Sequence, residues 1–137
     1  MNKITIHSSA TPASMDIGAK HIRQWHMAKG WHDIGYHWVI QRDGTLEKGR
    51  STTLPGAHVK GHNRDNIGIC LIGGMNAQHQ PENNFTPAQM HTLQTALLLL
   101  TEHHSLGQQD IYAHNELNPN TSCPSFNLKQ WLSRTFY

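Results

Sequence analysis

Ile67-Gly68-Ile69-Cys70-Leu71-Ile72 is an unbroken run of apolar and small residues, and two glycines follow it directly. A strand with one solvated face alternates apolar and polar residues, whereas a strand that is buried on both faces is apolar at nearly every position. The run is of the second kind, and sheets with such strands are covered by helices on both sides. It therefore predicts the buried strand of an α/β domain.

Other strand-like segments lie on both sides of this run along the chain. Residues 4–7 alternate in the manner of a short strand, and the turn-forming residues 8–12 stop it. The Arg42-Asp43-Gly44 turn joins an aromatic and β-branched segment to a second short one, which predicts a hairpin. The predicted strands cover residues 4–7, 36–41, 45–47, 67–72 and 110–113.

Helices are predicted between these strands. The first covers residues 18–29, and Gly30 suits the position just beyond a helix end. The second begins at a capping box formed by Thr86 and Gln89, with a proline at its first position, and continues to about residue 103. A third is capped at residue 127 and continues through residue 134. The positions of the last two helices that we expect to face the core are Leu93, Ala96, Leu97, Leu100, Leu128, Trp131 and Leu132.

The alternation of strands and helices predicts an α/β fold. At 137 residues, the chain is long enough for one domain with a hydrophobic core and too short for two, so we expect a single domain over residues 1–137. We expect a central mixed β-sheet flanked by helices. The order of the strands cannot be read from the pattern.

Charge and hydropathy exclude two classes of partner. The net charge is only +2, which does not support nucleic-acid binding through dense basic residues. No stretch approaches the roughly 18 apolar residues that a membrane-spanning helix needs, so no membrane insertion is expected. The first seven residues lack the features of a signal peptide, so we expect synthesis in the cytoplasm. Histidine stands out, with 12 copies against 9 acidic residues, and histidine is a frequent metal ligand and acid–base catalyst.

Three side chains could form a metal site at the ends of two predicted strands. His7 closes the first strand, His114 closes the strand over residues 110–113, and Cys123 follows in a loop that contains two prolines. A catalytic zinc site needs three protein ligands and one open position. These three residues provide such a set if the two strands are neighbours in the sheet.

The remaining histidines and the second cysteine have plainer interpretations. His37 alternates with Tyr36 on a predicted strand, so it points to the opposite face and is a weaker candidate for substrate contact. Cys70 reads as a small buried thiol, and a disulfide between Cys70 and Cys123 stays open. The histidines expected to be bystanders on helix faces, at helix ends or in loops are His21, His26, His32, His62, His79, His91, His103 and His104.

A set of ordered blocks covers nearly the whole chain, from residue 4 to about residue 134. The blocks include Ile6-His7-Ser8-Ser9-Ala10-Thr11, Trp31-His32-Asp33-Ile34-Gly35-Tyr36-His37-Trp38-Val39-Ile40, Asp43-Gly44-Thr45-Leu46-Glu47-Lys48-Gly49-Arg50, Gly56-Ala57-His58, Asn66-Ile67-Gly68-Ile69-Cys70-Leu71-Ile72-Gly73-Gly74 and His114-Asn115-Glu116 with Thr121-Ser122-Cys123-Pro124-Ser125-Phe126. Together they resemble the zinc-dependent N-acetylmuramoyl-L-alanine amidases of the phage lysozyme and peptidoglycan-recognition-protein type.

The resemblance implies a zinc site at the strand ends, in an open groove. It implies one Zn²⁺ per chain, bound by His7, His114 and Cys123, and a catalytic role for Tyr36, whose hydroxyl stays protonated and donates to water or to the oxyanion. Phage lysozymes of this type usually have a lysine two residues before the cysteine ligand, where this chain has Thr121. The Thr121 hydroxyl would then be the second donor to the oxyanion.

Other roles follow from the same resemblance. His58 and Asn63 match positions near the substrate groove. Glu116 is either a partner that orients a ligand or the base that takes the proton from water. The substrate would be peptidoglycan or a muropeptide, cleaved at the amide between N-acetylmuramic acid and L-alanine by a monomeric endolysin that reaches the cell wall through holin-type release or other delivery.

Other functions remain open from the sequence. Some members of the family are peptidoglycan-binding modules without activity, but such a module does not need the complete set of ligands and the tyrosine. A cytosolic amidase that recycles muropeptides usually has aspartate at the third ligand position, where this chain has Cys123. A secreted antibacterial effector would have the same catalytic core.

Overall fold

A five-stranded sheet forms the centre of the molecule in the computed structural model, which describes residues 1–136. Its strands lie in the order β4-β3-β5-β1-β7, and all neighbouring pairs are parallel except the antiparallel β3–β4 hairpin. Their bounds are β1 Lys3–Ser8, β3 Trp38–Ile40, β4 Leu46–Lys48, β5 Asn66–Leu71 and β7 Ile111–Ala113. The predicted mixed α/β fold is confirmed.

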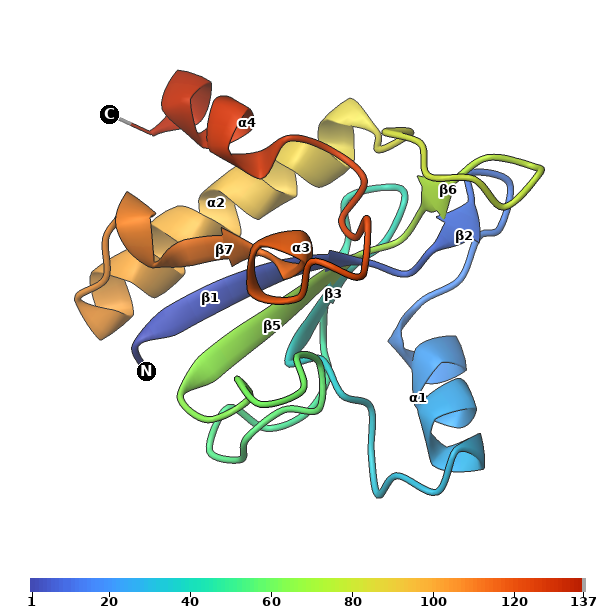
Figure 1. Cartoon of the computed structure of the whole chain (residues 1–137), viewed down its shortest axis with the longest axis horizontal. Coiled ribbons are helices and arrows are strands. Elements are labelled where there is room, and N and C mark those ends of the chain that lie inside the picture. The colour runs from blue at the N-terminus through green and yellow to red at the C-terminus, as the bar shows by residue number, and fades with distance from the viewer. Residues whose placement is uncertain (137) are drawn as a thin grey trace.

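The run that predicts the buried strand is β5, and every one of its residues is buried. It lies between β3 and β1 (Figure 1). Ile67, Ile69 and Leu71 point to one face of the sheet, where they pack with residues of two helices. Cys70 and Ile72 belong to a second apolar cluster on the other face. After the buried Asn66, the strand is apolar from Ile67 to Leu71 because side chains pack against both of its faces.

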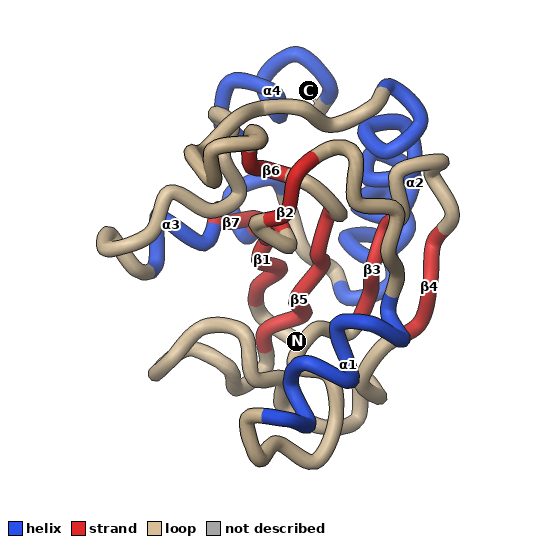
Figure 2. Tube along the Cα trace, turned by 90° about the vertical axis from the view of Figure 1, so that its right-hand side faces the viewer, coloured by secondary structure: helices blue, strands red, loops and turns tan. Residues whose placement is uncertain are grey.

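Helices cover the two faces unequally (Figure 2). The helix α2 (Pro87–His104) and the helix α4 (Leu128–Thr135) pack their buried leucines on one face. On the other face, the shorter α1 (Ala19–Ala28) contributes Ala19 and Ile22 to the smaller cluster. Helices therefore cover the second face only partly. His7 lies on this second face, because Ile6, the residue before it on β1, points to the first face and adjacent strand residues point to opposite faces.

The helix ends follow the predicted capping chemistry. The Thr86 hydroxyl accepts from the backbone N–H of Gln89 at 3.1 Å, and the Gln89 side chain accepts from the backbone N–H of Thr86 at 3.0 Å. Asn127 accepts from the backbone N–H of Gln130 at 3.0 Å and caps α4. Gly30 has a φ of +95° directly after the end of α1, a conformation that glycine adopts without strain.

Several short elements were not predicted. β2 (Thr11–Pro12) lies within the segment over residues 8–12 that the sequence predicts as a turn, and it pairs with β6 (Gly74–Met75). The 3₁₀ helix Gln108–Asp110 and the single-turn helix α3 (His114–Leu117) flank β7. These elements have two to four residues, too few for a hydrophobic period. Within the described residues, no helix has the length and apolar character needed to span a bilayer.

Candidate metal centre

The side chain of His7 is delivered by a central strand to the less covered face of the sheet. β1 lies between β5 and β7, and His7 is 1% exposed. The parallel register pairs Ile6 with Ala113, so the residue that follows on each of the two segments is a histidine. The condition that the sequence left open, that the two strands are neighbours, is thereby met.

His114 is the first residue of α3 and follows directly after β7. Glu116 caps this turn, because its Oε1 accepts from the backbone N–H of Ala113 at 2.9 Å, and its Oε2 lies 3.6 Å from Nζ of Lys129. Both carboxylate oxygens of Glu116 are thus engaged in holding the segment that carries His114. Of the two roles predicted for Glu116, this geometry favours the positioning one.

Cys123 is brought to the histidines by main-chain contacts. Its carbonyl oxygen accepts from the backbone N–H of Asn115 at 2.9 Å, which ties its loop to α3. Its Sγ accepts from the backbone N–H of Ser8 at 3.1 Å, which ties it to the end of β1. The Thr121 hydroxyl oxygen accepts from the backbone N–H of Cys123 at 3.2 Å.

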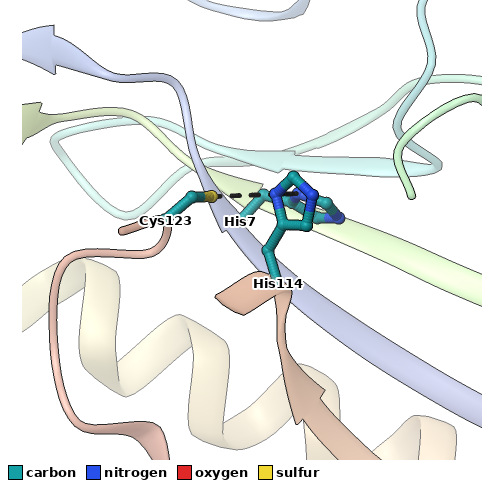
Figure 3. A group of neighbouring side chains, drawn as sticks. All are labelled: His7, His114 and Cys123. Carbon is teal, nitrogen blue, oxygen red and sulfur yellow. Dashed lines mark hydrogen bonds between the residues drawn. The ribbon is translucent and has the colours of Figure 1, made fainter. Parts of the chain in front are cut away.

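The three side chains point toward one another (Figure 3). Nδ1 of His7 lies 3.2 Å from Nδ1 of His114 and 3.9 Å from Sγ of Cys123, and the three donor atoms all lie within 4.8 Å of one another. Tetrahedral zinc with ordinary bond lengths separates two nitrogen ligands by about 3.3 Å and a nitrogen from a sulfur by about 3.6 Å. The arrangement and the donor types therefore fit zinc.

Burial controls the protonation of these groups. It lowers the pKa of His7 well below the usual value, with further lowering by His58 and His114, and it also lowers the pKa of His114. Both imidazoles are therefore neutral at pH 7 and have a free lone pair for a metal. Burial raises the pKa of Cys123 to about 11, against the opposing effect of the hydrogen bonds with Ser8. A metal that binds Cys123 must displace this thiol proton.

Tyr36 lies beside the metal-binding group. Its ring centroid is 5.0 Å from that of His7, and burial raises its pKa well above the usual value of 10, assisted by Cys70 and Cys123. The phenol is therefore protonated across the physiological range and can act as a hydrogen-bond donor at this site.

Two of the three weaker candidates are engaged within the protein. His37 is 1% exposed; its Nδ1 accepts from the backbone N–H of Gly68 at 3.0 Å, and its Nε2 lies 3.0 Å from the Leu54 carbonyl oxygen. Asn63 accepts from the backbone N–H groups of His58 and Val59, both at 2.8 Å. These contacts argue for supporting roles rather than direct contact of His37 with substrate.

His58 is 8% exposed and lies closer to the ligands than the sequence suggests. Its Nδ1 is 2.9 Å from Nε2 of His7, and its ring meets the His7 ring edge to face at a centroid distance of 4.9 Å. One edge of the residue still borders a groove of about 380 Å³, whose lining residues are Trp31, Ala57, His58, Val59, Lys60 and Asn63.

His26 is a supporting residue that sequence reasoning missed. Its Nδ1 accepts from the backbone N–H of Gly35 at 2.9 Å, and its ring packs 4.6 Å from Trp31 and 5.6 Å from Tyr36. It therefore holds the backbone just before Tyr36. The signal was available, because Ile22 and His26 are four residues apart on one helix and share its inward face.

Both cysteines are free thiols. The disulfide that the sequence left open is therefore wrong, because Cys70 is buried within β5 while Cys123 turns its sulfur to His7 and Ser8. Cys70 packs in the core, whereas Cys123 is a candidate metal ligand.

Known proteins resemble this chain over most of its length. The sequence profile of the family described as N-acetylmuramoyl-L-alanine amidase matches residues 1–126. An endolysin of Klebsiella phage KP32 is 48% identical over 130 residues, covering 95% of this chain and 84% of the relative. The endolysin of Escherichia phage T7 is 45% identical over 128 residues, covering 93% and 83%. The solved structure of the N-acetylmuramoyl-L-alanine amidase LysC from Clostridium intestinale superimposes with a TM-score of 0.83 at 28% identity, covering 97% of this chain and 83% of that one.

Proposed function

This chain belongs to the N-acetylmuramoyl-L-alanine amidase family, and from that premise we propose that His7, His114 and Cys123 bind one zinc ion at the centre of its active site. The chain is an amidase of the phage endolysin type, and zinc is typical of its family. Its substrate is bacterial peptidoglycan, in which it hydrolyses the amide between N-acetylmuramic acid and L-alanine. The observation that carries the zinc proposal is the 3.2 Å approach of the two histidine Nδ1 atoms beside the Cys123 sulfur.

The donor set determines what the site can do. Bound zinc supplies Lewis-acid chemistry, polarising the amide carbonyl and acidifying a water molecule. With two neutral imidazoles and one thiolate, the protein ligands contribute a single negative charge, so the centre keeps a net positive charge that favours a developing oxyanion. His7 is buried, but His114 and Cys123 are only half-buried, so a substrate would approach the centre from their side.

Tyr36 is the first proposed hydrogen-bond donor. Its phenol stays protonated because burial raises its pKa, and its ring lies 5.0 Å from the His7 ring. From that position the hydroxyl orients the attacking water or donates to the oxyanion that forms on the substrate carbonyl.

Thr121 is the proposed second donor. Its hydroxyl oxygen accepts from the backbone N–H of Cys123, and this contact leaves the hydroxyl hydrogen free to donate elsewhere. A threonine thereby supplies a hydrogen bond where many phage relatives of this type have a cationic lysine. The effect is to stabilise the oxyanion without adding a fixed charge to the site.

The groove beside His58 and Asn63 is the proposed substrate subsite. It is lined on one side by Trp31, whose ring lies under the ammonium group of Lys29 at 5.5 Å. An exposed aromatic ring with neighbouring cations suits a sugar ring and a carboxylate of the peptide stem. We further propose that the protein acts as a monomer, without nucleic acid or membrane partners, after holin-type release or other delivery to the wall.

Digestion of purified sacculi tests the activity directly. Mass spectrometry of the products should find a free lactyl carboxyl on N-acetylmuramic acid and a new amino terminus on L-alanine. A chelator should abolish this release, and added zinc should restore it. Release of reducing sugar ends without new alanine termini, or full activity of protein shown to be free of metal by elemental analysis, would contradict the proposal.

A further inference from the structure

The ring of His58 connects the candidate ligand His7 to the main chain of β5. Nδ1 of His58 lies 2.9 Å from Nε2 of His7, and Nε2 of His58 lies 3.0 Å from the carbonyl oxygen of Asn66. All three groups are buried. The hydrogen bonds thus form a short chain from the backbone, through one imidazole, to the other.

The direction of both hydrogen bonds follows from the carbonyl oxygen of Asn66, the one group in the chain whose role is fixed. A carbonyl oxygen can only accept, so Nε2 of His58 carries the proton. A neutral imidazole has one N–H, so Nδ1 of His58 accepts, and Nε2 of His7 must donate to it. The remaining nitrogen of His7, Nδ1, is therefore unprotonated, and it is the atom that faces His114 and Cys123.

We propose that His58 is a positioning residue for the metal, which holds His7 in the Nε2–H tautomer and so presents its Nδ1 as a ligand. The proposal rests on the metal site described above and deepens it. Metal-binding histidines are usually oriented by a carboxylate, a carbonyl or a water. Here the neutral imidazole of His58 orients His7 without adding a negative charge beside the centre.

The structure holds His58 firmly enough for this role. Asn63 anchors the backbone at His58. A Cβ placed on Gly68 would lie only 2.6 Å from Cδ2 of the His58 ring, so β5 needs glycine there to leave room for the ring. His37, which accepts from the backbone N–H of Gly68, meets the His58 ring edge to face at 5.8 Å. The two buried histidines and the glycine thus form one packed support.

Two variants of similar shape separate the tautomer role from simple packing. His58→Asn places an amide oxygen at the depth of Nδ1 and keeps an acceptor for His7, whereas His58→Leu has the same branching and no acceptor. Both lose the hydrogen bond to Asn66 equally. His58→Gln reaches to the depth of Nε2 and can still donate to Asn66, but it has no acceptor where Nδ1 was.

The measurement is the zinc dissociation constant, obtained by competition with a chelator of known affinity. His58→Leu and His58→Gln should weaken zinc binding by about 10–100-fold, the usual effect of losing an outer partner of a ligand, and His58→Asn should recover most of it. Equal zinc affinity for the Asn and Leu variants, or better binding by Gln than by Asn, would overturn the proposal.

A second measurement does not depend on the variants. Long-range ¹H–¹⁵N NMR of the zinc-loaded protein with labelled histidine should find His7 protonated at Nε2 and bound to zinc through Nδ1. Zinc bound through Nε2 of His7 would refute the role of His58 while leaving the metal site intact. If the unaltered protein binds no zinc, the metal site itself fails and the role of His58 fails with it.

Discussion

The Nδ1 atom of His7 lies 3.2 Å from the Nδ1 atom of His114, although 107 residues separate the two histidines in the chain. The parallel register of β1 and β7, which pairs Ile6 with Ala113, brings them together. Cys123 joins them because its sulfur accepts from the backbone N–H of Ser8, the residue after His7. The geometry of the centre is thus a property of two neighbouring strands and one loop, and substitutions in each part should have separable effects.

The two cysteines should behave differently toward zinc. Cys123→Ser should weaken zinc binding by at least about 10-fold, because it removes the only thiolate from the proposed ligand set. Cys70→Ser is the matched control, and it should keep zinc affinity because this thiol is buried in β5. Equilibrium dialysis with metal analysis measures both. Equal retention of zinc in the two variants would refute the ligand assignment.

Tyr36→Phe should separate metal binding from turnover. Within the protein the phenol is in hydrogen-bonding contact with the thiol of Cys70, which is not a proposed ligand, so the variant should bind zinc as the unaltered protein does. Its kcat should fall by about 10²–10³-fold, the usual cost of losing one hydrogen-bond donor to an oxyanion. Turnover of a soluble muropeptide, measured beside the zinc content, provides the test; an unchanged kcat would remove Tyr36 from the mechanism.

The kcat of Thr121 variants should depend on whether the new side chain can donate a hydrogen bond. Thr121→Val keeps the shape but has no hydroxyl, and its kcat should fall by about 10–10³-fold, up to the cost of losing one oxyanion donor. Thr121→Ser retains the hydroxyl and should stay within a few-fold of the original rate. Similar rates for the Val and Ser variants would show that the hydroxyl does not act on the oxyanion.

The free energy of unfolding should depend on pH through the protonation of His26. Burial lowers the pKa of His26 to about 4 from 6.5, with smaller contributions from the positive charges of Lys29 and Arg50. The neutral ring accepts from the backbone N–H of Gly35. Between these two values the unfolded state binds more protons than the folded state, so stability is complete above pH 6.5 and is lost as the pH falls toward 4.

The matched variant for this effect is His26→Asn, which keeps an acceptor at the depth of Nδ1 but does not titrate. Relative to it, the free energy of unfolding of the original protein should fall by roughly 1–3 kcal/mol between pH 6.5 and pH 4, with the range allowing for partial solvent exposure. Urea denaturation at each pH measures the difference. Parallel pH profiles for the two proteins would contradict the assignment.

Removal of the cap of α2 should cost stability without affecting zinc. The Thr86 hydroxyl accepts from the backbone N–H of Gln89 and donates to the carbonyl oxygen of Arg42 at 2.6 Å. Thr86→Ala should lower the free energy of unfolding by about 1–2 kcal/mol, whereas Thr86→Ser should lose much less. Chemical denaturation of both variants tests this, and similar losses in the two would show that the hydroxyl contributes little.

The elements that the sequence predicted correctly are those whose signals are local. The capping box at Thr86, the Arg42–Gly44 turn and the apolar run of β5 each depend on residues a few positions apart. The short elements β2, β6 and α3 were missed because two to four residues are stabilised by their neighbours in space and not by a period of their own.

For the site, the sequence by itself determined which donor atoms were available and that two of them stood at strand ends. A histidine at the end of a short strand and a cysteine in a proline-containing loop are visible in the chain because strand ends and turns have local chemical signatures. The family expectation came instead from the resemblance of the ordered blocks to known amidases.

Only the tertiary structure decided which donors meet. The neighbourhood of β1 and β7, and the contact of His58 with His7, depend on strand order and register, which arise from packing between segments far apart in the chain. Hydrogen-bond direction is decided there too: the carbonyl of Asn66 determines which nitrogen of His58 carries a proton, and through it which nitrogen of His7 is free to bind a metal.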